Sequence, residues 1–76
     1  MTSIARVTEI SATSDKSFED AIQQGIKRAT QTLRNVQGAW IKEQEVSVEN
    51  NKIVAYKVNM MITFVLEGEG DENLNP

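Results

Sequence analysis

The chain has 76 residues, with eight Lys and Arg against eleven Asp and Glu, and it contains neither Cys nor His. Disulfides and thiolate zinc sites are therefore excluded, and the most common metal ligand and general base is missing. A chain this short buries only about 60% of its unfolded surface, so we expect oligomerisation to stabilise it. It has no run of about 20 apolar residues, no signal peptide and no basic cluster. We expect a cytoplasmic protein that binds neither membranes nor nucleic acid.

The first half of the chain predicts a strand followed by a helix. Residues 4–11 favour a strand, and residues 12–16 form a turn rich in Ser, Thr and Asp. Residues 18–36 predict a helix, because apolar side chains recur there at the spacing of one helical face. These side chains are Phe18, Ala21, Ile22, Ile26, Ala29, Leu33 and Val36.

Signals for the ends and packing of this helix are also present. Ser17 is the expected N-cap, with Asp20 as its capping-box partner. Gly38 is the expected residue just after the C-terminus, where glycine adopts a left-handed conformation without penalty. Gly25 lies on the apolar face and predicts a close approach between helix and sheet, at a cost of about 1 kcal/mol in helix propensity relative to Ala.

The second half predicts a hairpin of two strands, residues 39–49 and 53–66, joined by a two-residue turn at Asn50 and Asn51. The even positions of the last strand are all apolar, which is typical of a buried face. They are Val54, Tyr56, Val58, Met60, Ile62, Phe64 and Leu66. The resulting fold class is α+β, with β-α-β-β order and a three-stranded antiparallel sheet wrapped on one helix.

The last strand is too long for an isolated domain of this size. Fourteen residues would extend ~46 Å, whereas a compact monomer would be only ~25 Å across. We therefore expect this strand to contact other copies of the chain. The ordered domain is expected at residues 1–66, followed by a disordered acidic tail at residues 67–76, which carries four of the acidic residues.

Candidate binding residues lie mainly on the strand at residues 39–49. Simple alternation places Glu43 and Glu45 on one face and Trp40 on the other. The two glutamates are expected to form a solvated or ion-paired face opposite a base of the last strand. The alternative is a calcium-type site completed by symmetry-related copies. Trp40 is interpreted as a core or interface anchor, with ligand stacking as the alternative.

Catalysis is not indicated by any motif, because the sequence has no nucleophile–base pair and no glycine-rich phosphate loop. Three arginines, Arg6, Arg28 and Arg34, would bind a phosphate group if neighbouring subunits brought them together. The alternative is that they are ordinary surface residues. The residues alone predict an assembling, non-enzymatic protein.

Four motifs extend this interpretation. They are V-x-E-I-x-x-T-S at residues 7–14, A-I-x-x-x-I-x-R-A at residues 21–29, T-L-R-N-V at residues 32–36 and Y-K-V-x-M-x-I-T-F-x-L-E at residues 56–67. With the β-α-β-β order, they resemble the dodecins over residues 4–67. The resemblance implies a hollow homododecamer that binds and stores small ligands without catalysis. Well-known dodecins bind stacked flavins, some bacterial members bind coenzyme A, and one branch binds calcium.

The flavin residues that the resemblance implies are poorly matched in this chain. Gly38 stands where the family has its stacking Trp, and Trp40 is two residues further along. Lys57 replaces the Gln that pairs with the flavin ring, and Glu45 and Val65 replace two bases that hold the flavin phosphate. We therefore expect weak or absent binding of riboflavin and FMN.

The residues that the resemblance associates with coenzyme A are present. They are Arg6, Arg28 and Arg34, with Thr32 and Gln37 nearby. The stretch at residues 38–49 is closer to the branch of the family without the flavin Trp, to which the calcium-binding members belong. Coenzyme A is thus an alternative ligand, and the alternative function is a calcium-binding or purely structural shell that does not bind flavin.

Overall fold

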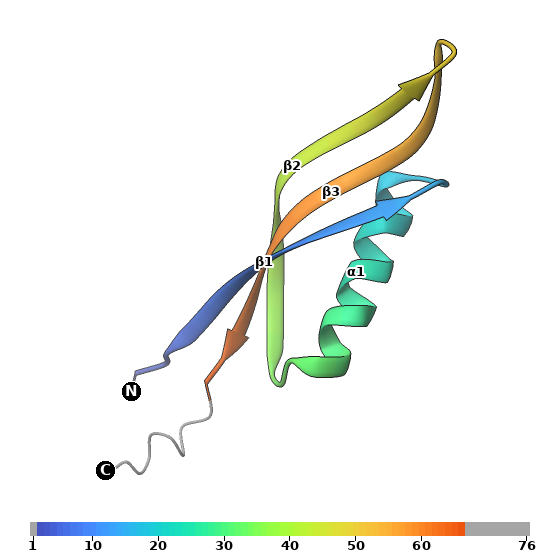
Figure 1. The fold of residues 1–76 in the computed structure, drawn as a ribbon. Coiled ribbons are helices and arrows are strands. Elements are labelled where there is room, and N and C mark those ends of the chain that lie inside the picture. Colours follow the sequence, from blue (N-terminus) through green and yellow to red (C-terminus); the bar gives the residue numbers. More distant parts are fainter. Residues whose placement is uncertain (1, 67–76) are drawn as a thin grey trace.

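The computed structural model describes residues 2–66, which form three strands and one helix. The elements are β1 (Ala5–Ser14), α1 (Phe18–Thr32), β2 (Val36–Glu49) and β3 (Lys52–Val65). The strands form one antiparallel sheet in the order β1-β3-β2, and α1 lies against one of its faces (Figure 1). The predicted α+β class and β-α-β-β order are confirmed. The acidic segment at residues 67–76 lies outside the described residues.

The core lies between α1 and the central strand. Val58, Met60 and Ile62 of β3 are fully buried beneath Ala21 and Ala29 of the helix. Burying a side chain of this size contributes roughly 1.5–3 kcal/mol.

Gly25 allows the helix to approach the sheet closely, as the sequence predicted. An added Cβ at Gly25 would clash with the Cε atom of Met60 and lie 3.2 Å from the Cβ atom of Ala12. A side chain at this position would therefore force the terminal methyl group of Met60 to move.

The start of α1 follows the prediction in part. The Oγ atom of Ser17 accepts a hydrogen bond of 2.9 Å from the backbone N–H of Asp20, as expected of an N-cap. The Asp20 carboxylate, however, accepts a 2.7 Å hydrogen bond from the hydroxyl of buried Ser14. β1 consequently continues to Ser14 instead of ending at residue 11, and its last residues pair with Val58 to Tyr56 of β3.

The end of α1 was predicted wrongly. The helix stops at Thr32, and Leu33 caps it with a 2.9 Å hydrogen bond from its N–H to the carbonyl of Ala29. Asn35, at φ 59°, makes the left-handed turn that was assigned to Gly38. The apolar pattern continues to Val36, but Val36 pairs with Phe64 as the first residue of β2. Pairing with β3 therefore overrides the helical periodicity.

The hairpin between β2 and β3 matches the prediction. Asn50 and Asn51 have φ values of 53° and 65°, the left-handed pair that a two-residue type I′ turn requires. β3 begins at Lys52 and ends at Val65, one residue earlier than expected at each end.

A β-bulge at Lys42 overturns the predicted alternation of β2. Ile41 pairs with Met60 and Glu43 pairs with the next residue, Asn59, so Lys42 has no partner of its own. Paired residues project to the same side of a sheet, and this extra residue reverses the alternation. Trp40 therefore shares a face with Glu43 and Glu45 instead of opposing them. We call this face, opposite α1, the outer face.

Much of the apolar surface remains uncovered. The helix packs against β1 and β3, whereas every residue of β2 after Val36 is exposed. Of the seven apolar even positions of the strand predicted at residues 53–66, only three are fully buried, and Val54 and Leu66 are 40% and 41% exposed. The described chain measures 59 × 19 × 13 Å, which agrees with the predicted overshoot of the long strand. In residues 2–66 no helix has the length and apolarity needed to cross a membrane.

Candidate functional site

The outer face carries most of the residues considered for flavin or metal binding. Gly38 pairs with Thr63, Trp40 with Met61, and Glu45 with Lys57, at alternate positions of β3. Since these pairs share one side of the sheet, Trp40 does point to the same side as Gly38. Its side chain is 52% exposed and available to a neighbouring molecule.

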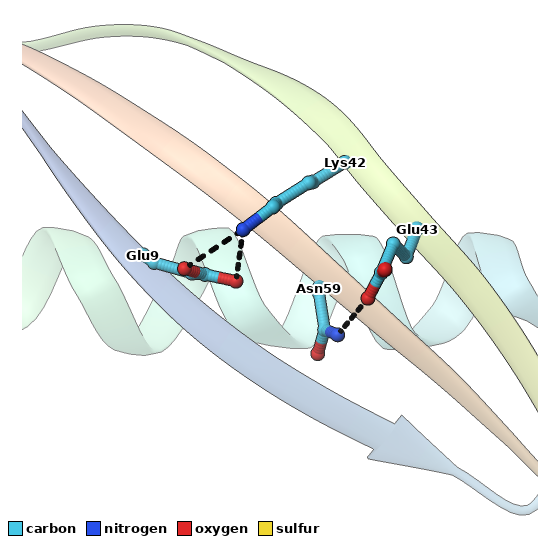
Figure 2. A network of polar contacts seen from close by, with 4 residues as sticks. All are labelled: Glu9, Lys42, Glu43 and Asn59. Carbon is cyan, nitrogen blue, oxygen red and sulfur yellow. Dashed lines mark hydrogen bonds and ion pairs between the residues drawn. The ribbon is translucent and has the colours of Figure 1, made fainter.

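Polar contacts on this face connect all three strands (Figure 2). The Lys42 ammonium reaches across β3 and donates to both carboxylate oxygens of Glu9 at 3.4 Å. The Asn59 amide donates to Glu43 Oε1 at 2.9 Å. The bulge makes this arrangement possible, because it turns Lys42 and Glu43 to the same side of the sheet.

Lys57 and Glu45 form a second ion pair, with 3.7 Å between Nζ and Oε1. Lys57 is thus the base that the sequence led us to expect opposite the glutamates. The pair is well exposed, so its contribution to stability is small. Both side chains nevertheless have a partner before any ligand arrives.

The residues present do not fit a flavin well. Gly38 offers no ring for stacking, and Lys57 donates hydrogen bonds but cannot accept them. Gly38 and Lys57 are also separated by six residues of β3, about 20 Å along the strand. Val65, at the far end of β3, contributes no charge. Its N–H donates to the carbonyl of Asn35, and its own carbonyl accepts a hydrogen bond from the Asn35 side-chain amide. One chain therefore does not bring these positions to a single ligand.

One chain provides only part of the coordination sphere that a bound cation would need. Glu43 and Glu45 share the outer face, but the first accepts from Asn59 and the second is paired with Lys57. Within residues 2–66 there is no group of three or more acidic side chains that would hold a metal. Calcium takes six to eight oxygen ligands in general, so further ligands would have to come from other copies.

An open groove of about 560 Å³ lies elsewhere, between β1 and α1. Arg28 and Thr32, two of the residues that the resemblance associated with coenzyme A, line it. The remaining lining residues are Thr8, Ile10, Ser11, Ala12, Thr13, Gln24, Gly25, Ala29 and Leu33. The sequence analysis missed Thr8 and Gln24 as residues of this groove, because their place in it depends on how α1 packs beside β1.

The other basic residues lie near one end of the sheet. Arg6 pairs with Phe64, and Phe64 pairs in turn with Val36, so Arg6 lies two strands from the turn that holds Arg34. Gln37 is the unpaired residue of a bulge after Val36. Arg28 donates to Gln31 Oε1 at 3.3 Å. In the part of the chain that the structure describes, neither of the two ion pairs involves an arginine.

The fold and these surfaces define a class of small subunit, with one helix on one face of a three-stranded sheet and an uncovered outer face. The dodecin from Streptomyces davaonensis has this fold: it is 33% identical, the match covers 88% of this chain and 98% of that one, and the TM-score is 0.82. The dodecin from Streptomyces coelicolor is 28% identical, with 86% and 93% covered and a TM-score of 0.81.

The dodecin family model matches residues 4–67, and the chain therefore belongs to the dodecin family. A more distant structure is that of the calcium dodecin from Mycobacterium tuberculosis, a calcium-chelating antigen. It is 23% identical over 84% of this chain and 91% of that one, with a TM-score of 0.73, and so shares the fold. A search of curated proteins finds no significant match.

Proposed function

We propose that the protein is a non-catalytic binding and storage protein that assembles as a homododecamer. Its proposed ligand is an anionic nucleotide-type cofactor such as coenzyme A. The observation that carries this proposal is the groove between β1 and α1, which Arg28 and Thr32 line together with Thr8 and Gln24. Guanidinium groups without a carboxylate partner are suited to phosphate, which they bind through paired hydrogen bonds.

Assembly is supported by the apolar side chains that a single chain leaves exposed. Val48 and Ile53 at the hairpin end of the sheet are 59% and 52% exposed, beyond the reach of α1. Further copies of the chain are the proposed cover for them. Light scattering at micromolar concentration should give the mass of twelve chains, and a stable monomer or dimer would contradict this part of the proposal.

The ligand proposal is tested by removing one charge from the groove. Arg28→Ala is expected to weaken the binding of coenzyme A by about 10- to 150-fold, since a hydrogen bond to a charged group is worth roughly 1.5–3 kcal/mol. Isothermal titration calorimetry on the assembled protein measures the affinity.

Lys27→Ala is the matched control for this variant. It removes one positive charge from the adjacent helical position, which does not line the groove. It should change the affinity by less than about threefold, the effect of a screened surface charge. Equal losses in the two variants would show that only net charge matters and would contradict a ligand site at Arg28.

Flavin at the outer face is the second candidate, favoured by the exposed Trp40. Its indole lies on the same side as Gly38, two pairs further along β3. Fluorescence titration decides between the two: submicromolar flavin affinity that disappears in Trp40→Ala would make Trp40 a replacement stacking residue and would overturn the expectation of weak binding.

Calcium is a third candidate, supported by Glu43 and Glu45 on one face of β2. Symmetry-related copies would have to supply the remaining oxygen ligands, and the Lys57 partner of Glu45 would have to be displaced. A colourless preparation whose melting temperature rises with calcium would favour this candidate. Mass spectrometry of co-purified molecules distinguishes all three.

A further inference from the structure

The strand β1 lies at one edge of the sheet and has a free backbone edge on the side away from β3. It pairs with β3 alone, in a register that continues without a bulge from Ala5 to Ser14. Within residues 2–66, the backbone hydrogen bonds outside the helix and the strand pairs involve no backbone group of β1. The N–H and C=O groups on the free side of the strand are therefore open to a ligand.

Hydrogen bonds at the end of β3 show which residues of β1 have groups on this free side. The N–H of Leu66 donates to the carbonyl of Ile4 at 2.9 Å, so these two residues form a hydrogen-bonded pair. Val65, one pair further in, instead donates to the carbonyl of Asn35 at 3.0 Å, on the side of β2. Because hydrogen-bonded pairs alternate with pairs whose backbone groups point away from each other, every second residue of β1 directs its N–H and C=O to the free edge. These residues are Ala5, Val7, Glu9, Ser11 and Thr13.

Two of these residues, Ser11 and Thr13, line the groove between β1 and α1. Their β3 partners, Asn59 and Lys57, lie on the outer face, and paired residues project to the same side of a sheet. The side chains of Ser11 and Thr13 therefore belong to the outer face, and what these residues present to the groove is backbone. Two residues along a strand are about 7 Å apart, so the groove has two sets of backbone donor and acceptor in a line.

The opposite wall of the groove is the helix α1, which runs beside β1 and contributes Gln24 and Arg28 (Figure 1). The Arg28 guanidinium is exposed and donates to Gln31 Oε1 at 3.3 Å, and none of the ion pairs within residues 2–66 includes it. The groove is also lined by four apolar residues, Ile10, Ala12, Ala29 and Leu33. It thus combines backbone donors and acceptors on the β1 side, apolar side chains, and one positive charge on the helix side.

A secondary amide complements a residue of this free edge, because it carries one donor and one acceptor and the residue offers one of each. The pantetheine arm of coenzyme A is an extended chain with two such amides and a phosphate at one end. The adenine base also has a donor beside an acceptor, but it is a single group and would occupy only one edge residue. The pantetheine arm with its phosphate therefore matches more of the groove than the nucleotide does.

We infer that the groove binds a phosphopantetheine group, with its phosphate at Arg28 and its two amides hydrogen-bonded to the backbone of Ser11 and Thr13. The inference rests on the proposed function, and it names the part of coenzyme A that the groove recognises. It also widens the ligand class, since any molecule that carries a phosphopantetheine group would bind, with or without a nucleotide.

Ligand fragments test the inference on the assembled wild-type protein. Isothermal titration calorimetry compares 4′-phosphopantetheine with hexyl phosphate, which has a phosphate and a flexible chain but no amide. 4′-Phosphopantetheine should bind about 5- to 150-fold more tightly, because its amides add two sets of neutral hydrogen bonds. Equal affinities of the two compounds would overturn the inference.

Coenzyme A and adenosine 3′,5′-bisphosphate separate this inference from the proposed function. If coenzyme A binds no more tightly than the bisphosphate and 4′-phosphopantetheine does not bind, the inference is overturned and the proposed function stands. If 4′-phosphopantetheine binds and coenzyme A does not, the inference stands and the proposed cofactor function is contradicted.

The backbone contact is tested by Ser11→Pro, which removes one N–H from the free edge and leaves the hydrogen bonds to β3 in place. Proline is tolerated at such positions of edge strands. The variant should bind 4′-phosphopantetheine about 2- to 13-fold more weakly. Two matched controls should change the affinity by less than about twofold: Ser11→Ala removes only the hydroxyl, and Ala5→Pro removes a free-edge N–H outside the groove. An unchanged affinity in Ser11→Pro, or an equal loss in Ser11→Ala, would contradict the backbone contact.

Light scattering and circular dichroism on Ser11→Pro complete the test. The variant should keep its helix and sheet and the mass of the wild-type assembly. A folded variant that no longer assembles would show that this edge pairs with another copy of the chain, and would overturn the inference. If the variant does not fold, the fragment comparison on the wild-type protein decides.

Discussion

Replacing Gly38 by Trp and Lys57 by Gln together should raise the riboflavin affinity of the assembled protein by about 30- to 25,000-fold. Stacking a flat ring system on an indole is worth roughly 1–3 kcal/mol. Supplying an amide that both donates and accepts recovers about another 1–3 kcal/mol, by leaving no ligand group unpaired. Quenching of riboflavin fluorescence measures the affinity directly.

The structure permits this substitution. An added Cβ at Gly38 meets no atom within 4 Å, and the residue does not have a positive φ. The wild-type glycine therefore reflects neither a tight contact nor a strained turn in the described chain, and this position of β2 has open space around an added Cβ. Removing Lys57 breaks an ion pair that is largely exposed, which costs little.

Two comparisons make this prediction specific. Gly38→Ala with Lys57→Gln adds a Cβ without a ring and should recover only the amide part of the gain. The affinity for FMN should rise less than that for riboflavin in the double variant with Trp at position 38. Lys57→Gln leaves the Glu45 carboxylate without its partner, so that it repels the phosphate of FMN. A double variant that binds riboflavin no better than the wild type would show that Gly38 and Lys57 are not what limits flavin binding.

The second large effect concerns the contact between Gly25 and Met60. Met60→Ala should lower the free energy of unfolding by about 2–5 kcal/mol, since it opens a cavity at a fully buried position. Gly25→Ala in the wild type should lower it by about 1–2 kcal/mol, because overpacking against Met60 outweighs the gain of about 1 kcal/mol in helix propensity.

In the Met60→Ala background the sign of the second substitution should change. The clash with the Met60 Cε atom is gone, so Gly25→Ala becomes neutral or stabilising by up to about 1 kcal/mol. Urea unfolding at one fixed chain concentration measures all four proteins, since association contributes to the apparent stability. Gln23→Ala, on the exposed side of the same helical turn, is the control. It should change the free energy of unfolding by the same amount in the wild type and in Met60→Ala. Equal effects of Gly25→Ala in both would exclude the proposed contact.

Local signals in the sequence determined several elements of this protein by themselves. The Ser17 cap and the paired left-handed residues Asn50 and Asn51 were predictable, because each depends on interactions within a few neighbouring residues. The apolar run centred on Met60 likewise identified the buried strand, since period-two burial follows from strand geometry alone.

Pairing between distant segments decided the rest. The helix ends at Thr32 because Val36, the first residue of β2, pairs with β3. The apolar pattern at Val36 alone would suit either a helix or a strand. The set of residues on the outer face depends on the bulge at Lys42. Because Lys42 is unpaired, Trp40 lies on the same side of the sheet as Glu43 and Glu45. The groove at Arg28 likewise exists only where α1 lies beside β1. Strand register and helix packing join residues far apart in the chain, and their energies are not encoded in any local pattern.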